Sequence, residues 1–211
     1  MDKGILELES KLGLEPGFFK NLQAEDDWSF VIKLHALFEA ACTHLLLFHF
    51  REPNLTELLS RMELSGRPVG KLAMLGELGL LGSAERRFIA ALSELRNSLV
   101  HDVRNHRYSL SEMVAALNPE KLRQFAITFS PFETGVRTAN EMATVLGEKA
   151  LDGRLTRQAD ITALIFRARG SPKTHIWLGA TAVLTTILDM YGYSDYKQWV
   201  KAAALFDEEA D

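Results

Sequence analysis

Cysteine is nearly absent from this 211-residue sequence: Cys42 is the only one, so no intramolecular disulfide can form. Cys42 lies in an apolar run, where a cysteine usually packs as a small hydrophobic residue and does not act as a nucleophile. A glycine-rich phosphate loop is also missing, because "SGRPVGKL" at 65–72 lacks the strand and the spacing of a P-loop. The sequence therefore excludes a disulfide scaffold and shows no nucleotide-binding motif.

Positive charge is not in excess. The chain has 24 lysine and arginine residues against 28 aspartate and glutamate residues, which gives a formal net charge of −4. Proteins that bind nucleic acid over their general surface are usually basic, so any RNA contact here must come from a local patch.

Uninterrupted hydrophobic segments are also scarce. The first residues, MDKGILELESKLGLEP, contain no apolar core of the kind a signal peptide has. A membrane span rarely carries as many polar groups as the most apolar stretch here, 30–50. That stretch is interrupted by Lys33, His35, Glu39, His44 and His49. We therefore expect a cytoplasmic protein without membrane contact.

Apolar residues recur at helical spacing along almost the whole chain. With 47% hydrophobic residues the sequence can bury a sizeable core, and its length suits one domain. The only candidate strand is short, "FAITFS" at 125–130. The pattern predicts an all-α fold with helices over 3–12, 16–23, 28–50, 54–63, 69–81, 83–102, 109–117, 119–127, 136–149, 156–168, 173–191 and 194–206.

The stretch "ELRNSLVHD", residues 94–102, places three polar residues at the end of an apolar helix. Arg96 presents a planar cation that suits phosphate oxygens, and Asn97 can orient either its partner or the phosphate. His101 lies near the helix C-terminus, where the helix dipole favours the protonated imidazole. The three residues are therefore candidates for a phosphodiester site.

A group of this composition can cleave RNA without a metal ion. One group removes the proton of the ribose 2′-hydroxyl, a cation stabilises the charge on the phosphate, and a proton is delivered to the 5′-oxygen. A two-fold dimer would bring two such pairs into one cleft. The next residues form a local positive stretch with an aromatic ring on which a base can stack: Arg104, His106, Arg107 and Tyr108.

Ordinary structural roles explain the same residues. Arg96 can pair with Glu94, with Asp102 or with a carbonyl at the helix end, and His101 can be a C-terminal cap. The spacing by itself leaves this alternative open. No metal or other cofactor is expected, because the candidate ligands on the first long helix have no second cluster to complete a tetrahedral set: His35, Glu39, Cys42 and His49.

"RNSLVH" has the form Arg-Asn-x-x-x-His, which resembles the signature of the HEPN superfamily of small helical domains. Residues 69–112 are similar to the mannitol operon repressor (MtlR) family, which has a HEPN-like fold. The toxin subgroup of HEPN proteins often has a tyrosine two residues after the histidine, where this chain has Val103.

The resemblance spans about residues 28–191 and implies an antiparallel helical bundle with extra short helices at the N-terminus and in the C-terminal half. It divides the chain into a short helical appendage (1–27), one HEPN-like domain (28–206, with an insertion near 130–170) and an acidic tail (207–211).

The resemblance implies two alternative functions. Many HEPN proteins are homodimeric, metal-independent endoribonucleases of toxin–antitoxin, phage-defence and RNA-processing systems. This implies that Arg96 and His101 are catalytic on single-stranded RNA, that Asn97 supports them, and that Glu39 and Asp102 assist. Other members, the MtlR type included, are regulators without demonstrated cleavage, which implies a role in transcriptional regulation through a protein partner. For the nuclease, the protein partner would be an antitoxin.

Overall fold

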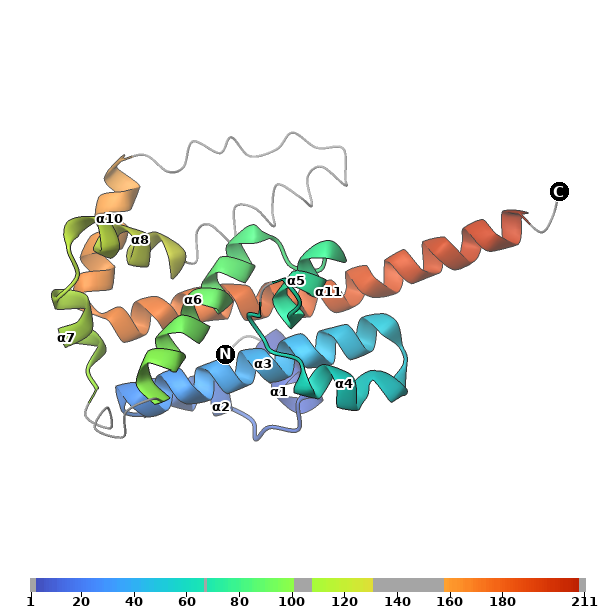
Figure 1. Cartoon of the computed structure of the whole chain (residues 1–211), viewed down its shortest axis with the longest axis horizontal. Coiled ribbons are helices and arrows are strands. Elements are labelled where there is room, and N and C mark those ends of the chain that lie inside the picture. Colours follow the sequence, from blue (N-terminus) through green and yellow to red (C-terminus); the bar gives the residue numbers. More distant parts are fainter. Residues whose placement is uncertain (1–2, 67, 101–107, 131–157, 209–211) are drawn as a thin grey trace.

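The computed structural model describes the backbone of residues 3–66, 68–100, 108–130 and 158–208. It describes the side chains of 5–66, 68–100, 108–130 and 161–195. Every regular element in these ranges is helical (Figure 1), so the prediction of an all-α fold is confirmed. The expected helix at 136–149 lies outside the described residues.

The helices follow one another with short connections. Two single turns of 3-10 helix, Leu22–Ala24 and Pro53–Leu55, lie between longer elements. The α-helices are α1 (Lys3–Lys11), α2 (Phe18–Asn21), α3 (Asp27–Phe50), α4 (Thr56–Arg61), α5 (Lys71–Glu77), α6 (Ser83–Val100), α7 (Leu110–Ala115), α8 (Pro119–Thr128), α10 (Gln158–Gly170) and α11 (Pro172–Glu208).

Several helix starts have a local cause that is visible in the sequence. The Asn118 side chain accepts a hydrogen bond from the Lys121 backbone N–H at 2.8 Å, and Pro119 occupies the first position of α8. Ser109 caps α7 in the same way. Asp26 accepts from the Ser29 N–H at 2.9 Å and caps α3. Each of these three helices therefore begins at a side-chain cap.

The one candidate strand is excluded, and one expected division between helices is wrong. The segment 125–130 is not a strand, because α8 runs on to Thr128. The helices expected at 173–191 and 194–206 form one continuous helix, α11. The helix continues through Gly192, and beyond it Ser194 and Asp195 bind residues of α3.

The long helices α3 and α11 lie side by side and run in the same direction (Figure 1). Their contacts keep one register: His44 binds Tyr191, His49 binds Ser194 and Arg51 pairs with Asp195, with partners 144 to 147 residues apart. The first turn of α3 also pairs with Lys173 of α11.

Helix α6 crosses α3 in the opposite direction. His35 of α3 meets Ser93 of α6, while Phe38, further along α3, meets Phe88, earlier on α6. The expected antiparallel arrangement is therefore found for α3 and α6 and not for α3 and α11.

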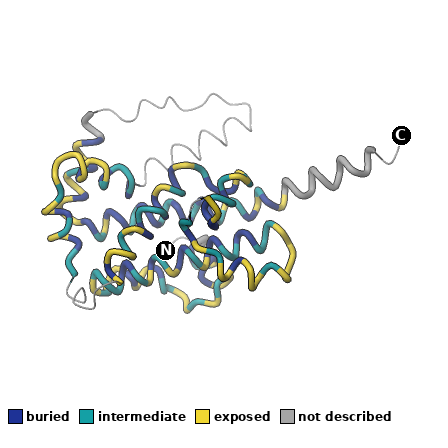
Figure 2. The backbone as a smooth tube through the Cα atoms, in the orientation of Figure 1, coloured by how far each residue is buried: buried dark blue, intermediate teal, exposed yellow. Residues whose placement is uncertain are grey.

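Helix α3 is a core helix, with buried residues spread along it (Figure 2). It packs against α11, α6, α5 and α4, and buries side chains along its whole length, among them Phe30, Leu34, Phe38 and Leu45. By length and composition α3 is apolar enough to cross a membrane, but 50% of its apolar window is buried inside the protein. That burial is typical of a core helix, and one such helix is weak evidence for a membrane span.

The N-terminal segment shares the main core. Ile5 and Leu8 of α1 are buried, with α1 packed on α11, and Phe19 stacks on the Trp177 ring with 5.1 Å between ring centroids. Inside this segment, Glu9 is buried and its carboxylate accepts hydrogen bonds from the Gly17 and Phe19 backbone N–H groups. The segment therefore docks on its own chain.

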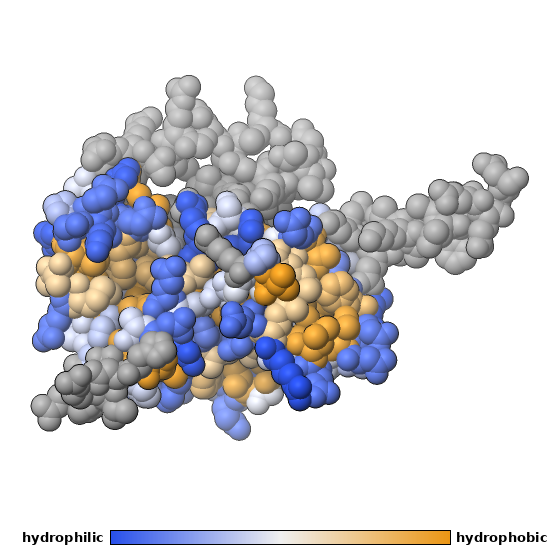
Figure 3. All heavy atoms as spheres, in the orientation of Figure 1, coloured by the Kyte–Doolittle hydropathy of each residue, from blue (hydrophilic) through white to orange (hydrophobic). Residues whose placement is uncertain are grey.

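The far end of the molecule is formed by α7, α8 and α10 around the start of α11 (Figure 1). At the other end, the last turns of α11 extend past the body. The viewed surface mixes polar and apolar residues (Figure 3). The large apolar side chains exposed among the described residues are Phe50, Leu58, Val69, Val100 and Phe166.

Candidate functional site

Arg96 and Asn97 lie in the last turn and a half of α6, where the sequence analysis placed them. Arg96 is partly exposed, and its Nη1 donates to the Asn97 side-chain oxygen at 3.1 Å. Within the described part of the chain, the guanidinium has no carboxylate partner, and Glu94 is exposed without pairing to it. The Arg96 charge is thus oriented by an amide and is not neutralised by an acid of the described residues.

A histidine of α3 faces α6 one turn before Arg96. His35 Nε2 lies 3.2 Å from the Ser93 hydroxyl, and that hydroxyl donates to the Ile89 carbonyl at 3.0 Å. Because Ser93 has one proton, already donated, its oxygen must accept from His35. Neutral His35 therefore carries its proton on Nε2 and has a lone pair on Nδ1.

A buried lysine holds the acid on the next turn of α3. Lys71, the first residue of α5, has a side chain only 1% exposed, and its Nζ donates to Glu39 Oε1 at 3.1 Å. The Glu39 side chain is 41% exposed. An ammonium is strongly disfavoured in a dry interior without a partner, so Glu39 compensates the burial of Lys71.

These residues of α3, α5 and α6 interact pairwise or through their charges, and we call them the polar seam: Lys71, Glu39, His35, Ser93 and Arg96. Burial lowers the pKa of His35; Glu39 opposes this shift, and the positive charges of Arg96 and Lys71 add to it. His35 is therefore held neutral near pH 7. Arg96 is close enough for its charge to act on His35.

Several predicted site residues lie outside the described part of the chain: His101, Asp102, Arg104 and Arg107. Tyr108 is the first residue described after them. It is partly buried against the main core, and its hydroxyl is buried without a hydrogen-bond partner among the described residues. Burial, together with Asp27, raises the Tyr108 pKa. The Tyr108 ring contacts the core, so less of it is available to stack on a base.

Sequence reasoning missed Lys71 and Ser93. Lys71 opens the apolar run "KLAMLGELGLL", where a lone charged residue normally lies on the solvent side; its position under Glu39 depends on the packing of α5 against α3. Ser93 had a weak signal, since it lies three residues before Arg96 and therefore on a neighbouring position of the same helix face.

Metal and nucleophile chemistry have no support in the described residues. No group of three histidine, cysteine, aspartate or glutamate residues there is arranged to hold a metal ion. Cys42 is fully buried, and burial raises its pKa to about 12, so its thiol stays protonated and inaccessible. The described part of the polar seam and its neighbour Asn97 thus offer a cation, an amide and an imidazole.

Comparison with known proteins gives no match: no protein-family model, no curated protein and no solved structure corresponds to this chain. The resemblance to HEPN proteins rests on the residues quoted above.

Proposed function

We propose that the protein is a HEPN-like, metal-independent endoribonuclease that cleaves single-stranded RNA as a homodimer. The observation that carries the proposal is the state of Arg96. Its guanidinium is partly exposed, fixed by Asn97 and not neutralised by any described carboxylate, so its charge can meet a phosphate. A structural arginine in a buried ion pair would lack this capacity.

The roles follow from the chemistry of each group. Arg96 binds the scissile phosphate and stabilises the charge that develops on it, and Asn97 holds Arg96 in place. His101 delivers a proton to the leaving 5′-oxygen. Arg104 and Arg107, with Asp102 and Tyr108, complete the RNA contact in this proposal.

Glu39 takes a positioning role. It pairs with Lys71 and lies one turn from His35, so its charge acts on these two residues. No described interaction joins Glu39 directly to Arg96. The site then needs two copies of the chain, because one arginine and one histidine are a small set for this reaction.

The test is cleavage of a labelled single-stranded RNA pool in EDTA. Wild type should leave 2′,3′-cyclic phosphate ends, and Arg96→Ala and His101→Ala should each lower the rate by at least about a hundredfold. Arg123→Ala, which removes an exposed arginine of α8, is the matched charge control and should cleave like wild type. Equal loss in Arg123→Ala would mean that only general charge matters.

The second candidate is a non-catalytic regulator of the MtlR type, acting through a protein partner in the cytoplasm. Two observations favour it: Glu39 is engaged by Lys71, and the Tyr108 ring packs on the core. A folded dimer that cleaves no RNA at any salt concentration would support this candidate. A toxin or phage-defence role would instead be supported by growth arrest on expression that requires Arg96 and is relieved by an antitoxin.

A further inference from the structure

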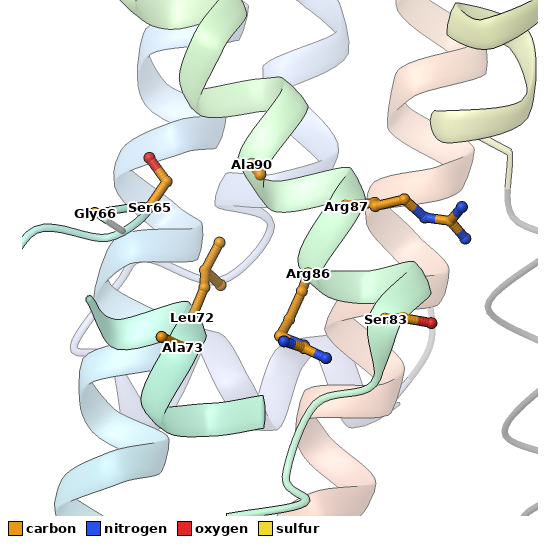
Figure 4. Close-up of a pocket in the computed structure, with 8 residues that line it drawn as sticks. All are labelled: Ser65, Gly66, Leu72, Ala73, Ser83, Arg86, Arg87 and Ala90. Carbon is orange, nitrogen blue, oxygen red and sulfur yellow. The ribbon is translucent and has the colours of Figure 1, made fainter. Parts of the chain in front are cut away.

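A cavity of about 360 Å³ lies between residues 65–66 and 72–73 on one side and the first half of α6 on the other (Figure 4). Its apolar side is formed by Leu72, Ala73 and Ala90, and its polar side by hydroxyls and arginines: Ser65, Ser83, Arg86 and Arg87. A volume near 360 Å³ is within the range of small-molecule sites.

The Arg86 guanidinium is seated against a glycine of α5. A Cβ atom at Gly76 would lie 2.6 Å from Nη1 and 2.7 Å from Cζ of Arg86, so the guanidinium occupies the space that any side chain at 76 would need. Arg86 Nε also approaches the Gly82 carbonyl at 3.3 Å. Arg86 thus uses Nε for the Gly82 carbonyl, and its two Nη groups can still donate to another acceptor.

The polar groups around the cavity have donors to spare. Among the described residues Arg86 has no carboxylate partner, and the hydroxyls of Ser65 and Ser83 make no hydrogen bond. Arg87 differs from Arg86: its guanidinium points away from the cavity in Figure 4, although its stem contributes to the lining. The Ser83 hydroxyl is directed to the same side as Arg87, and the Ser65 hydroxyl points outward on the opposite side (Figure 4), so the cavity combines one cation with an apolar wall.

We propose that this cavity binds a small phosphomonoester with an apolar body. Arg86 takes the phosphate, since its planar guanidinium matches phosphate oxygens. The apolar body lies against Leu72, Ala73 and Ala90. The proposal does not depend on RNA cleavage, because none of these residues belongs to the polar seam.

The test is a titration of the ¹⁵N-labelled full-length protein with phenyl phosphate, which joins a phosphomonoester to an apolar ring. The amide signals of Ser65, Gly66 and Ser83 should shift and saturate, while neutral benzyl alcohol should leave them in place. Arg86→Gln should weaken binding at least about tenfold. Gly76→Ala should do the same without removing charge, because its Cβ displaces only the far end of a flexible side chain.

Two controls separate this site from general charge. Arg87→Gln removes a neighbouring arginine that points away, and its affinity should stay within about twofold of wild type. Gly66 lines the cavity, and a carboxylate oxygen of Glu63 lies 2.8 Å from the position a Cβ at Gly66 would take. Glu63→Gln should therefore tighten binding, because it removes a negative charge near the bound phosphate.

Three outcomes would overturn the proposal. One is the absence of shifts at these amides at about 10 mM phenyl phosphate, which would mean that any dissociation constant is well above that concentration. Another is equal binding by wild type and Arg86→Gln in a folded variant. The third is equal affinity for inorganic phosphate and phenyl phosphate, which would remove the role of the apolar wall.

Discussion

At the scale of single residues, the most unusual feature is the buried ammonium of Lys71. Its partner Glu39 is partly exposed and can be hydrated by itself, whereas Lys71 cannot. Removing either partner should therefore have unequal effects, because the cost is set by which charge is left buried and alone.

The corresponding prediction concerns stability in urea. Glu39→Ala should lower the free energy of unfolding by about 1–3 kcal/mol, since it leaves the Lys71 ammonium without its carboxylate. Lys71→Met keeps the volume and removes the charge, so it should stay within about 1 kcal/mol of wild type. In the double variant the cost of Glu39→Ala should largely disappear. Additive costs would show that the pair is not coupled.

A second residue, His175 of α11, links stability to pH. It is fully buried, its Nε2 donates to the Ala126 carbonyl at 2.9 Å, and Nδ1 has no partner among the described residues. Burial lowers the pKa of His175; the bond to Ala126 opposes this shift, and Arg167 adds to it. The folded protein therefore resists protonation that the unfolded chain accepts.

The sign of the pH effect follows from this difference. The stability that neutral His175 contributes is complete above a pH of about 6.5 and is lost as the pH falls toward the lower folded-state pKa, by up to about 1.4 kcal/mol per pH unit. His175→Gln retains an N–H donor and does not titrate. Urea unfolding from pH 7.5 to 5.0 should show a shallower loss for the variant than for wild type.

Part of the acid sensitivity should remain in His175→Gln, because burial also lowers the pKa values of His35 and His44. If both proteins lose the same free energy between pH 7.5 and 5.0, His175 is not a source of the dependence.

At the scale of one element, α11 contains two glycines in different surroundings. A Cβ at Gly179 would lie 2.4 Å from the Phe129 carbonyl oxygen and 2.8 Å from a ring carbon of Phe88. A Cβ at Gly192 would meet nothing within 4 Å. The close approach of α11 to its neighbours thus depends on the first glycine and not on the second.

Alanine at these two positions should have opposite effects on thermal stability. Gly179→Ala should destabilise by about 1–3 kcal/mol, since backbone and core ring must move apart. Gly192→Ala should stabilise by up to about 1 kcal/mol through helix propensity. Thermal unfolding followed by circular dichroism measures both. A stabilised Gly179→Ala would contradict the close packing at Phe129.

At the scale of the whole molecule, the first helices complete the core. Phe19 of α2 is buried and stacks on Trp177, whose indole N–H donates to the Phe19 carbonyl at 3.2 Å. A segment that was only an appendage would contribute little to global stability. One that fills the core should unfold together with the rest.

Phe19→Ala should therefore lower the free energy of unfolding by about 3–5 kcal/mol in a single cooperative transition. Its neighbour Phe18 is partly exposed and serves as the matched control; Phe18→Ala should cost clearly less. A cost under about 1 kcal/mol for Phe19→Ala, or a separate early transition, would mean that the N-terminal segment is an independent unit.

The sequence by itself determined the helical class and many helix boundaries. Periodic apolar residues define the helices, and the side chains of Ser109 and Asn118 cap neighbouring backbone groups, so these features depend on residues only a few positions apart. The polar residues Arg96 and Asn97 were identifiable for the same reason, since they are adjacent on one helix.

Only the tertiary structure decided what those helices bury. The burial of Lys71, the bond between His35 and Ser93, and the shared direction of α3 and α11 join residues that are 32 to 147 positions apart. The tertiary structure also decided that α11 continues through Gly192. A glycine inside a helix weakens it by about 1 kcal/mol, and the contacts of Ser194 and Asp195 with α3 outweigh that cost. Such contacts depend on how whole helices pack, which no short stretch of sequence specifies.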